Sequence, residues 1–156
     1  MRFYNQQHKF YCGIDLHARK MYVCILDAQG KTKVHQNLDT DAELLFDVIF
    51  PFLEDVVICV ECMFSWYWIS DFCTEHKIPF VLGHALYMKA IHGGKTKNDK
   101  IDSYKIAKLL MGGNLPIAYA LSGQNACHTR FAAPADLHGA SMRPAAGPYP
   151  EHQHTV

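Results

Sequence analysis

The order of apolar segments between Phe10 and Ala120 is the feature that most constrains the fold. The first three segments have the character of strands, namely FYCGIDLH, MYVCILDAQG and KTKVHQNL. A helical pattern, a short buried strand, a second helix, a further strand and a last helix then follow in turn. We therefore expect an antiparallel three-stranded start that continues into one mixed α/β sheet.

This order is that of the RNase H-like sheet, so the predicted fold is a mixed sheet of about five strands flanked by helices. Asp39 or Thr40 is expected to cap the first helix, in DAELLFDVIFPFLE, and Pro51 to end or kink it. The last helix is expected in DKIDSYKIAKLLMGG, where the glycine pair stops it. A short helix is expected over Tyr87 to His92.

A chain of 156 residues is long enough for one domain with its own core. We place this domain at residues 10–120, after an extension at 1–9. Residues 121–156 contain no lysine or isoleucine but four of the seven prolines, and they show no period, so a disordered tail is expected. With suitable codons chosen for this segment, the nucleotides read one base further on can encode a basic, leucine-rich helix, which leads to the hypothesis of a frameshift after Ala120.

Other general features exclude several classes of protein. The N-terminus has no secretory pattern, and no apolar run approaches the length of a membrane span. The six cysteines are scattered among apolar positions, which favours reduced, buried thiols in a cytoplasmic protein. The balance of 15 basic and 15 acidic residues gives no overall indication of nucleic-acid binding.

Four acidic residues lie where a metal site could form. Asp15 interrupts an apolar strand, and an unpaired buried carboxylate is costly. Glu61 ends the strand VVICVE on the same face as Val57 and Cys59. Asp99 and Asp102 lie three residues apart at a helix start and so share a face. Together these carboxylates could hold the Mg²⁺ ions, or Mn²⁺ in their place, of a two-metal phosphoryl-transfer site.

Each acid also has an ordinary explanation. Asp15 could begin a turn with His17 as its partner, and Glu61 could end a strand in solvent. Acids such as Asp99 and Asp102 are favoured in the first turn of a helix whether or not they bind a metal. His17 lies near the site, but a structural histidine is more common than a catalytic one.

A lysine-rich stretch surrounds the helix-borne acids. It comprises Lys89, Lys95, Lys97, Lys100, Lys105 and Lys108. The stretch can simply be a solvated helix face, or it can be a surface that binds nucleic acid. In the second case we expect the first five of these lysines to contact the nucleic acid. The aromatic residues Trp66 to Trp68 could stack on bases, although helix packing explains at least two of them. Cys59 and Cys62 point to opposite faces of a strand, which argues against a zinc or redox pair.

The segments GIDLHARKMYVCILDAQGK, VVICVECMFSWYWISDFC, LGHALYMKAIHGGKTKNDKIDSYKIAKLL and LPIAYA closely resemble the N-terminal domain of the DEDD insertion-sequence transposases. This group is related to the Piv invertases and has a RuvC-like catalytic domain. The resemblance implies that Asp15, Glu61, Asp99 and Asp102 are the four acids of the family name. It also implies Mg²⁺-dependent cleavage and exchange of DNA strands, an element-encoded RNA as guide, assembly into homo-oligomers, and a bacterial, nucleoid-associated location.

The family continues with a helical segment and a second domain that supplies a serine nucleophile. This chain leaves the pattern at Leu121, and Ser122 and Ser141 are assigned no role. We therefore expect a truncated transposase that has lost full activity. The alternatives are a non-catalytic nucleic-acid-binding protein and a stand-alone RuvC-like junction nuclease. An actin-like ATPase would need a second glycine-rich phosphate hairpin, which the sequence lacks.

Overall fold

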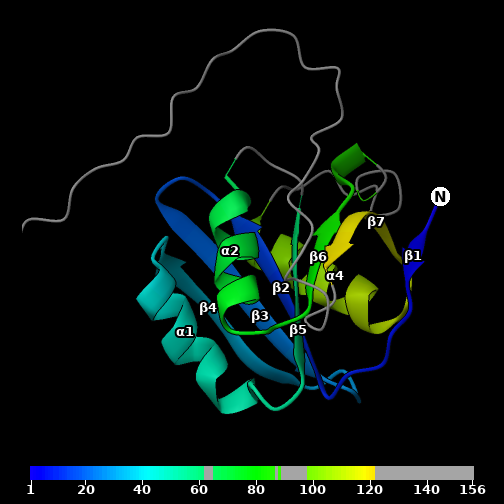
Figure 1. Ribbon diagram of the computed structural model, residues 1–156, viewed down its shortest axis with the longest axis horizontal. Helices are drawn as coiled ribbons and strands as arrows, with labels where there is room; N and C mark the ends of the chain where they lie inside the picture. The colour runs from blue at the N-terminus through cyan, green and yellow to red at the C-terminus, as the bar shows by residue number, and fades with distance from the viewer. Residues whose placement is uncertain (62–64, 87, 89–97, 122–156) are drawn as a thin grey trace, which may run out of the picture.

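A seven-stranded sheet forms the centre of the molecule (Figure 1). The computed structural model describes residues 1–61, 65–86, 88 and 98–121. The strands are β1 (Phe3–Tyr4), β2 (Phe10–Leu16), β3 (Lys20–Asp27), β4 (Thr32–Asp39), β5 (Val56–Glu61), β6 (Phe80–Gly83) and β7 (Leu115–Leu121). The helices are α1 (Ala42–Ile49), the short 3-10 helix η1 (Phe50–Phe52), α2 (Tyr67–Glu75) and α4 (Asp99–Met111).

The strand order β1-β7-β6-β5-β2-β3-β4 contains the predicted arrangement. Strands β2, β3 and β4 form an antiparallel meander, while β2 pairs with β5 and β5 with β6 in parallel. The five strands β6-β5-β2-β3-β4 therefore have the RNase H-like order, with the first strand of the meander in the middle of the sheet. The predicted mixed α/β sheet is confirmed.

Two strands were not expected, so the prediction of about five strands was too low. Strand β1 lies in the N-terminal extension, has only two residues and pairs with β7. Strand β7 contains Pro116, and a proline in an apolar run argues against a strand because it cannot donate a hydrogen bond. Here Pro116 is opposite Phe3 in the pairing with β1 at the sheet edge, and its carbonyl accepts a hydrogen bond from His84 N at 2.9 Å.

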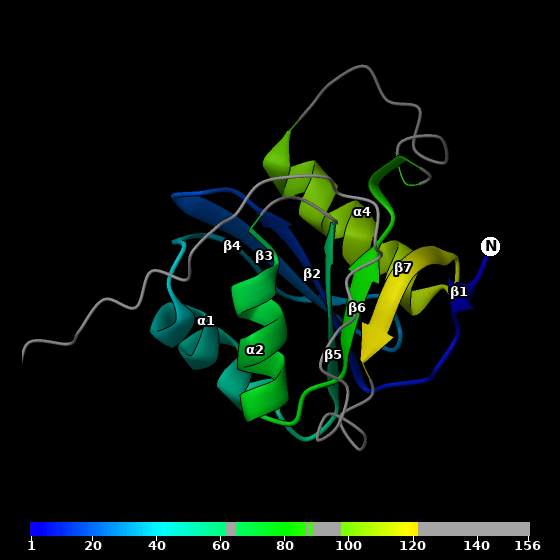
Figure 2. The same cartoon turned by 45° about the horizontal axis from the view of Figure 1, so that its top comes forward.

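The helices cover both faces of the sheet (Figure 2). Helices α1 and α2 lie on one face, where Leu45 and Ile69 pack in the same core as Ile14. Helix α4 lies on the other face, where Ile106 packs with Tyr11. Alternate residues of the central strand therefore enter two different cores.

The cap of the first helix lies two residues after the earlier of its two predicted caps. Its cap is Asp41, whose Oδ1 accepts hydrogen bonds from Glu43 N at 2.9 Å and Leu44 N at 3.1 Å, and not Asp39 or Thr40. Strand β4 extends through Asp39, which leaves only the next residues to start the helix. The α-helix ends before Pro51 and changes to a 3-10 turn, as predicted.

Four cysteines, Cys12, Cys24, Cys59 and Cys73, are free and buried, as expected for reduced thiols. Burial raises the pKa of each of the four thiols, to about 11 for Cys24. Cys62 and Cys127 lie outside the described residues, as do most of the predicted short helix over Tyr87 to His92 and all but Leu121 of the predicted tail. None of the described helices has the length and apolar character needed to cross a membrane.

Candidate metal centre

The carboxyl ends of two neighbouring parallel strands bring Asp15 and Glu61 to the same edge of the sheet. In the register of β2 with β5, Ile14 is opposite Val60, and the two acids directly follow this pair. Both acids lie on the face that α4 covers, because alternate residues of the two strands, Tyr11 and Val57, pack with this helix. The predicted meeting of these two strands at one edge is confirmed.

A glycine in the central strand lets α4 approach this edge. A Cβ atom on Gly13 would lie 2.4 Å from the backbone nitrogen of Ala107 and 2.5 Å from the carbonyl oxygen of Ser103. Real Cβ atoms essentially never come this close to backbone atoms. Helix α4 therefore crosses β2 directly over Gly13, two residues before Asp15, and its first turn extends toward the site.

The first turn of α4 is held by side chains that are not the two acids. The Oδ1 atom of Asn98 caps the helix by accepting a hydrogen bond from Lys100 N at 3.0 Å. From β4, His35 Nε2 donates to the carbonyl oxygen of Lys100 at 2.8 Å, and Ser103 Oγ donates to the same oxygen at 3.0 Å. Because Asn98 is the cap, the carboxylate of Asp99 can turn toward the sheet.

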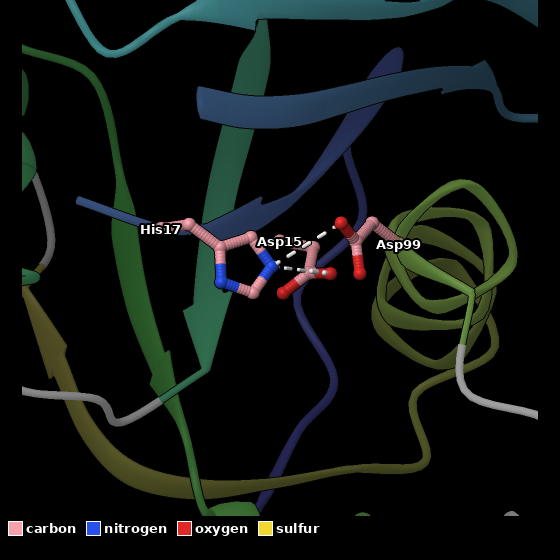
Figure 3. A group of neighbouring side chains, drawn as sticks. All are labelled: Asp15, His17 and Asp99. Atoms are coloured by element: carbon pink, nitrogen blue, oxygen red, sulfur yellow. Dashed lines mark ion pairs between the residues drawn. The ribbon is translucent and has the colours of Figure 1, made fainter. Parts of the chain in front are cut away.

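Three side chains meet at this point, where one ring nitrogen of a histidine faces two aspartates (Figure 3). His17 Nε2 lies 3.4 Å from Asp15 Oδ2 and 3.5 Å from Asp99 Oδ2. One ligand atom from each residue lies within 4.8 Å of the others. Asp15 and His17 come from the end of β2 and Asp99 from the start of α4, so the cluster joins the sheet to the helix.

The buried aspartate in this cluster has the properties of a metal ligand. Asp15 is only 8% exposed, and its Oδ2 atom is buried without a hydrogen-bond partner among the described residues. Burial raises the pKa of Asp15, the charge of His17 lowers it, and the charges of Asp99 and Asp102 raise it further, so the net pKa lies above its usual value. A divalent cation would relieve both the missing hydrogen bond and the repulsion between the carboxylates, so the cluster can bind a metal.

The predicted acids are therefore brought together only in part. Asp15 and Asp99 belong to the closest group, whereas Glu61 and Asp102 do not. Asp102 is near enough to affect the pKa of Asp15, and its Oδ1 lies 3.9 Å from Lys105 Nζ. The sequence favours a structural histidine at position 17 only because such histidines are more common than catalytic ones. The alternation that places Glu61 also places His17 on the same face as Asp15.

The described part of the predicted basic surface comprises Lys100, which is exposed, and Lys105, which is half-buried. Lys89, Lys95 and Lys97 lie outside the described residues. Among the aromatic candidates, Trp66 and Trp68 pack against the core, whereas Tyr67 is 64% exposed and stacks on Trp66 with ring centroids 4.0 Å apart. The prediction that helix packing explains two of the three is confirmed.

Comparison with curated proteins gave no match. Among solved structures, Thermus thermophilus RuvC is 13% identical, with a TM-score of 0.48 over 69% of this chain and 99% of that chain. T. thermophilus RuvC in complex with Holliday junction substrate is 14% identical, with a TM-score of 0.49 over 70% of this chain and 99% of that chain. These two similarities are too weak to bear on function.

Comparison with family models gives a match over most of the chain. The model of the IS110 DEDD transposases, described as "Transposase", matches residues 12–123. This range begins in β2, contains the Asp15–His17–Asp99 cluster together with Glu61 and Asp102, and includes the end of β7. The chain belongs to the IS110 family of DEDD transposases.

Proposed function

We propose that this chain provides the catalytic metal centre for DNA strand cleavage and exchange in transposition. Its ligands would be Asp15, Glu61, Asp99 and Asp102, and its ion Mg²⁺, with Mn²⁺ as a substitute. The observation that carries the proposal is the position of Asp15, a nearly fully buried carboxylate with an unsatisfied oxygen, close to a second carboxylate from another element. Bound divalent ions would activate the attacking oxygen and stabilise the leaving oxygen in phosphoryl transfer.

The protein's own part in this proposal is to hold the carboxylates in place. Asp15 and Glu61 are on adjacent central strands, whose backbone hydrogen bonds fix their separation. Asp99 is on a helix anchored through Asn98 and His35. Ligands on rigid elements lose little conformational entropy when an ion binds, which favours binding of the ion.

We propose DNA as the partner at this edge, with an element-encoded RNA as guide and a homo-oligomer as the assembled form. The positive charges of Lys100 and Lys105 on α4 support a phosphate backbone beside the acids. Binding of this kind weakens as the salt concentration rises, because counterions are released from the nucleic acid. Replacing either lysine with glutamine should therefore reduce the slope of affinity against salt concentration.

Calorimetric titration of the whole chain with Mn²⁺ and Mg²⁺ tests the metal centre. Asp15→Asn, Asp99→Asn and Asp102→Ala should each weaken binding at least tenfold with little loss of fold stability. A suitable control is Asp47→Asn, an exposed aspartate of α1 on the opposite face of the sheet, which should leave the affinity unchanged. Unchanged affinity in Asp102→Ala would remove that residue from the site, and unchanged affinity in Asp15→Asn would refute the site altogether.

Cleavage assays separate the catalytic role from the alternatives. Mn²⁺-dependent cleavage of branched DNA that Glu61→Gln abolishes would support a junction nuclease that acts by itself. Salt-dependent DNA binding that persists in Asp15→Asn, with no cleavage by the wild-type chain, would support a non-catalytic nucleic-acid-binding protein.

A further inference from the structure

We propose that His17 is a nitrogen ligand of the metal centre and biases it toward Mn²⁺ over Mg²⁺. The inference rests on the proposed function, because Asp15 and Asp99 would hold the same ion. It goes beyond that function by adding a ligand outside the four acids and by naming the ion that the mixed set of ligands prefers.

The position of one ring nitrogen, which faces two carboxylates, is the first support. His17 Nε2 lies almost equally far from Asp15 Oδ2 and Asp99 Oδ2, at 3.4 and 3.5 Å, and is a buried atom without a hydrogen-bond partner among the described residues. A histidine that served only as an ion-pair partner would gain most by a short hydrogen bond to one carboxylate. Two ligands at right angles, each about 2.1 Å from an ion, lie about 3 Å apart, so a contraction of a few tenths of an ångström gives the spacing of ligands.

The backbone of His17 is fixed on both sides, which is the second support. His17 N donates a hydrogen bond to the carbonyl oxygen of Lys20 at 2.9 Å, and Thr40 Oγ1 donates to the carbonyl oxygen of His17 at 2.9 Å. Its side chain is still 38% exposed although Nε2 is buried, so other atoms of the ring contact solvent. A ligand held in this way needs little reorganisation on binding.

The chemistry of imidazole predicts the choice of ion. Mg²⁺ strongly prefers six oxygen ligands and gives up water reluctantly. Divalent transition metal ions accept imidazole nitrogen, and Mn²⁺ combines this property with a preference for carboxylates. The two aspartates would attract either ion, whereas His17 would add affinity mainly for Mn²⁺.

Electron paramagnetic resonance of the full chain with Mn²⁺ tests the inference without any activity assay. Wild type is compared with His17→Gln, which removes the nitrogen ligand but keeps a polar side chain. The matched control is His84→Gln, because His84 is also half-buried and directly follows β6 near the same edge of the sheet. Bound Mn²⁺ is measured from the loss of the free-ion signal, Mg²⁺ affinity by competition, and coordinated nitrogen from spin-echo modulation by ¹⁴N.

We expect ¹⁴N modulation in wild type and in His84→Gln and none in His17→Gln. The Mn²⁺ affinity of His17→Gln should fall at least tenfold, while its Mg²⁺ affinity changes less than threefold. Modulation that is absent from wild type, or that persists in His17→Gln, overturns the inference. If wild type binds Mn²⁺ in a manner that depends on Asp15 but shows no nitrogen, only this inference fails. If it binds no Mn²⁺, the proposed function fails with it.

Discussion

Replacing Gly13 with alanine tests the contact that brings α4 over the candidate metal centre. The added Cβ would lie 2.4 Å from Ala107 N and 2.5 Å from the Ser103 carbonyl oxygen. Ordinary non-bonded contacts of this kind are about 3.5 Å, so α4 would have to move away from β2 by roughly 1 Å. Because both neighbouring atoms belong to the backbone, no change of side-chain rotamer can relieve the overlap.

Overpacking of a core costs about 1–3 kcal/mol, whereas the smaller conformational freedom of alanine in the unfolded chain returns about 0.4–1 kcal/mol. Because both overlaps are with backbone atoms, the cost should lie at the upper end of this range, and we expect the free energy of unfolding of Gly13→Ala to fall by about 2 kcal/mol after the return is subtracted. With a urea dependence of about 2 kcal/mol per molar, the midpoint of urea unfolding, followed by tryptophan fluorescence, should fall by about 1 M. Because the shift also separates Asp99 from Asp15, the affinity for Mn²⁺ should fall too.

The matched control is Gly83→Ala on β6. A Cβ there would lie 2.7 Å from Met88 Sδ, an atom of a flexible side chain that can move aside. Its loss of stability should be clearly smaller than that of Gly13→Ala. If Gly13→Ala instead unfolds at the wild-type urea concentration and binds Mn²⁺ as wild type does, α4 does not pack on β2 at Gly13. The geometry of the site would then be wrong.

Three further substitutions give separable outcomes. Asp15→Asn should raise the melting temperature of the metal-free protein. Burial raises the pKa of Asp15, so its ionised form opposes folding at neutral pH. A lower melting temperature in Asp15→Asn would contradict this. Asp41→Ala removes the cap of α1 and should cost about 1 kcal/mol in urea unfolding without altering Mn²⁺ affinity. For Asp55, burial raises the pKa, but hydrogen bonds from His8 Nδ1 and Lys9 N outweigh it and leave the pKa lowered. Its carboxylate therefore stabilises the fold above the unfolded pKa of about 3.9, and this stabilisation is lost as the pH falls through the lower folded value. The stability difference between wild type and Asp55→Asn should thus shrink below about pH 4; an equal difference at pH 7 and pH 3 would refute it.

The positions of the strand-borne acids could be predicted because they depend on local rules. An acid inside an apolar strand and an acid at the end of a neighbouring parallel strand must reach the same edge once the strand order is known. The period of two then places Asp15 and Glu61 on one face. The same rules predicted α4 and the acids in its first turn.

What the sequence could not give is the distance between elements. Whether Asp99 reaches Asp15 depends on where α4 crosses β2, and this is decided by backbone contact at Gly13, which leaves no periodic signal. Strand β7 could not be predicted because it contains Pro116, which argues against a strand. Pro116 pairs with β1, an edge strand of two residues that is too short to show a pattern in the sequence. The place of His17 in the cluster could not be predicted, because a single histidine beside an aspartate has several ordinary explanations that only its distances to other elements distinguish.

A crystal structure of the full chain with bound Mn²⁺, measured with the anomalous scattering of the metal, would show directly whether Asp15 and Asp99 hold an ion. We expect an anomalous peak about 2.0–2.3 Å from carboxylate oxygens of Asp15 and Asp99, at the carboxyl end of β2. A peak elsewhere on the molecule, or none at saturating Mn²⁺ with these side chains well ordered, would contradict it.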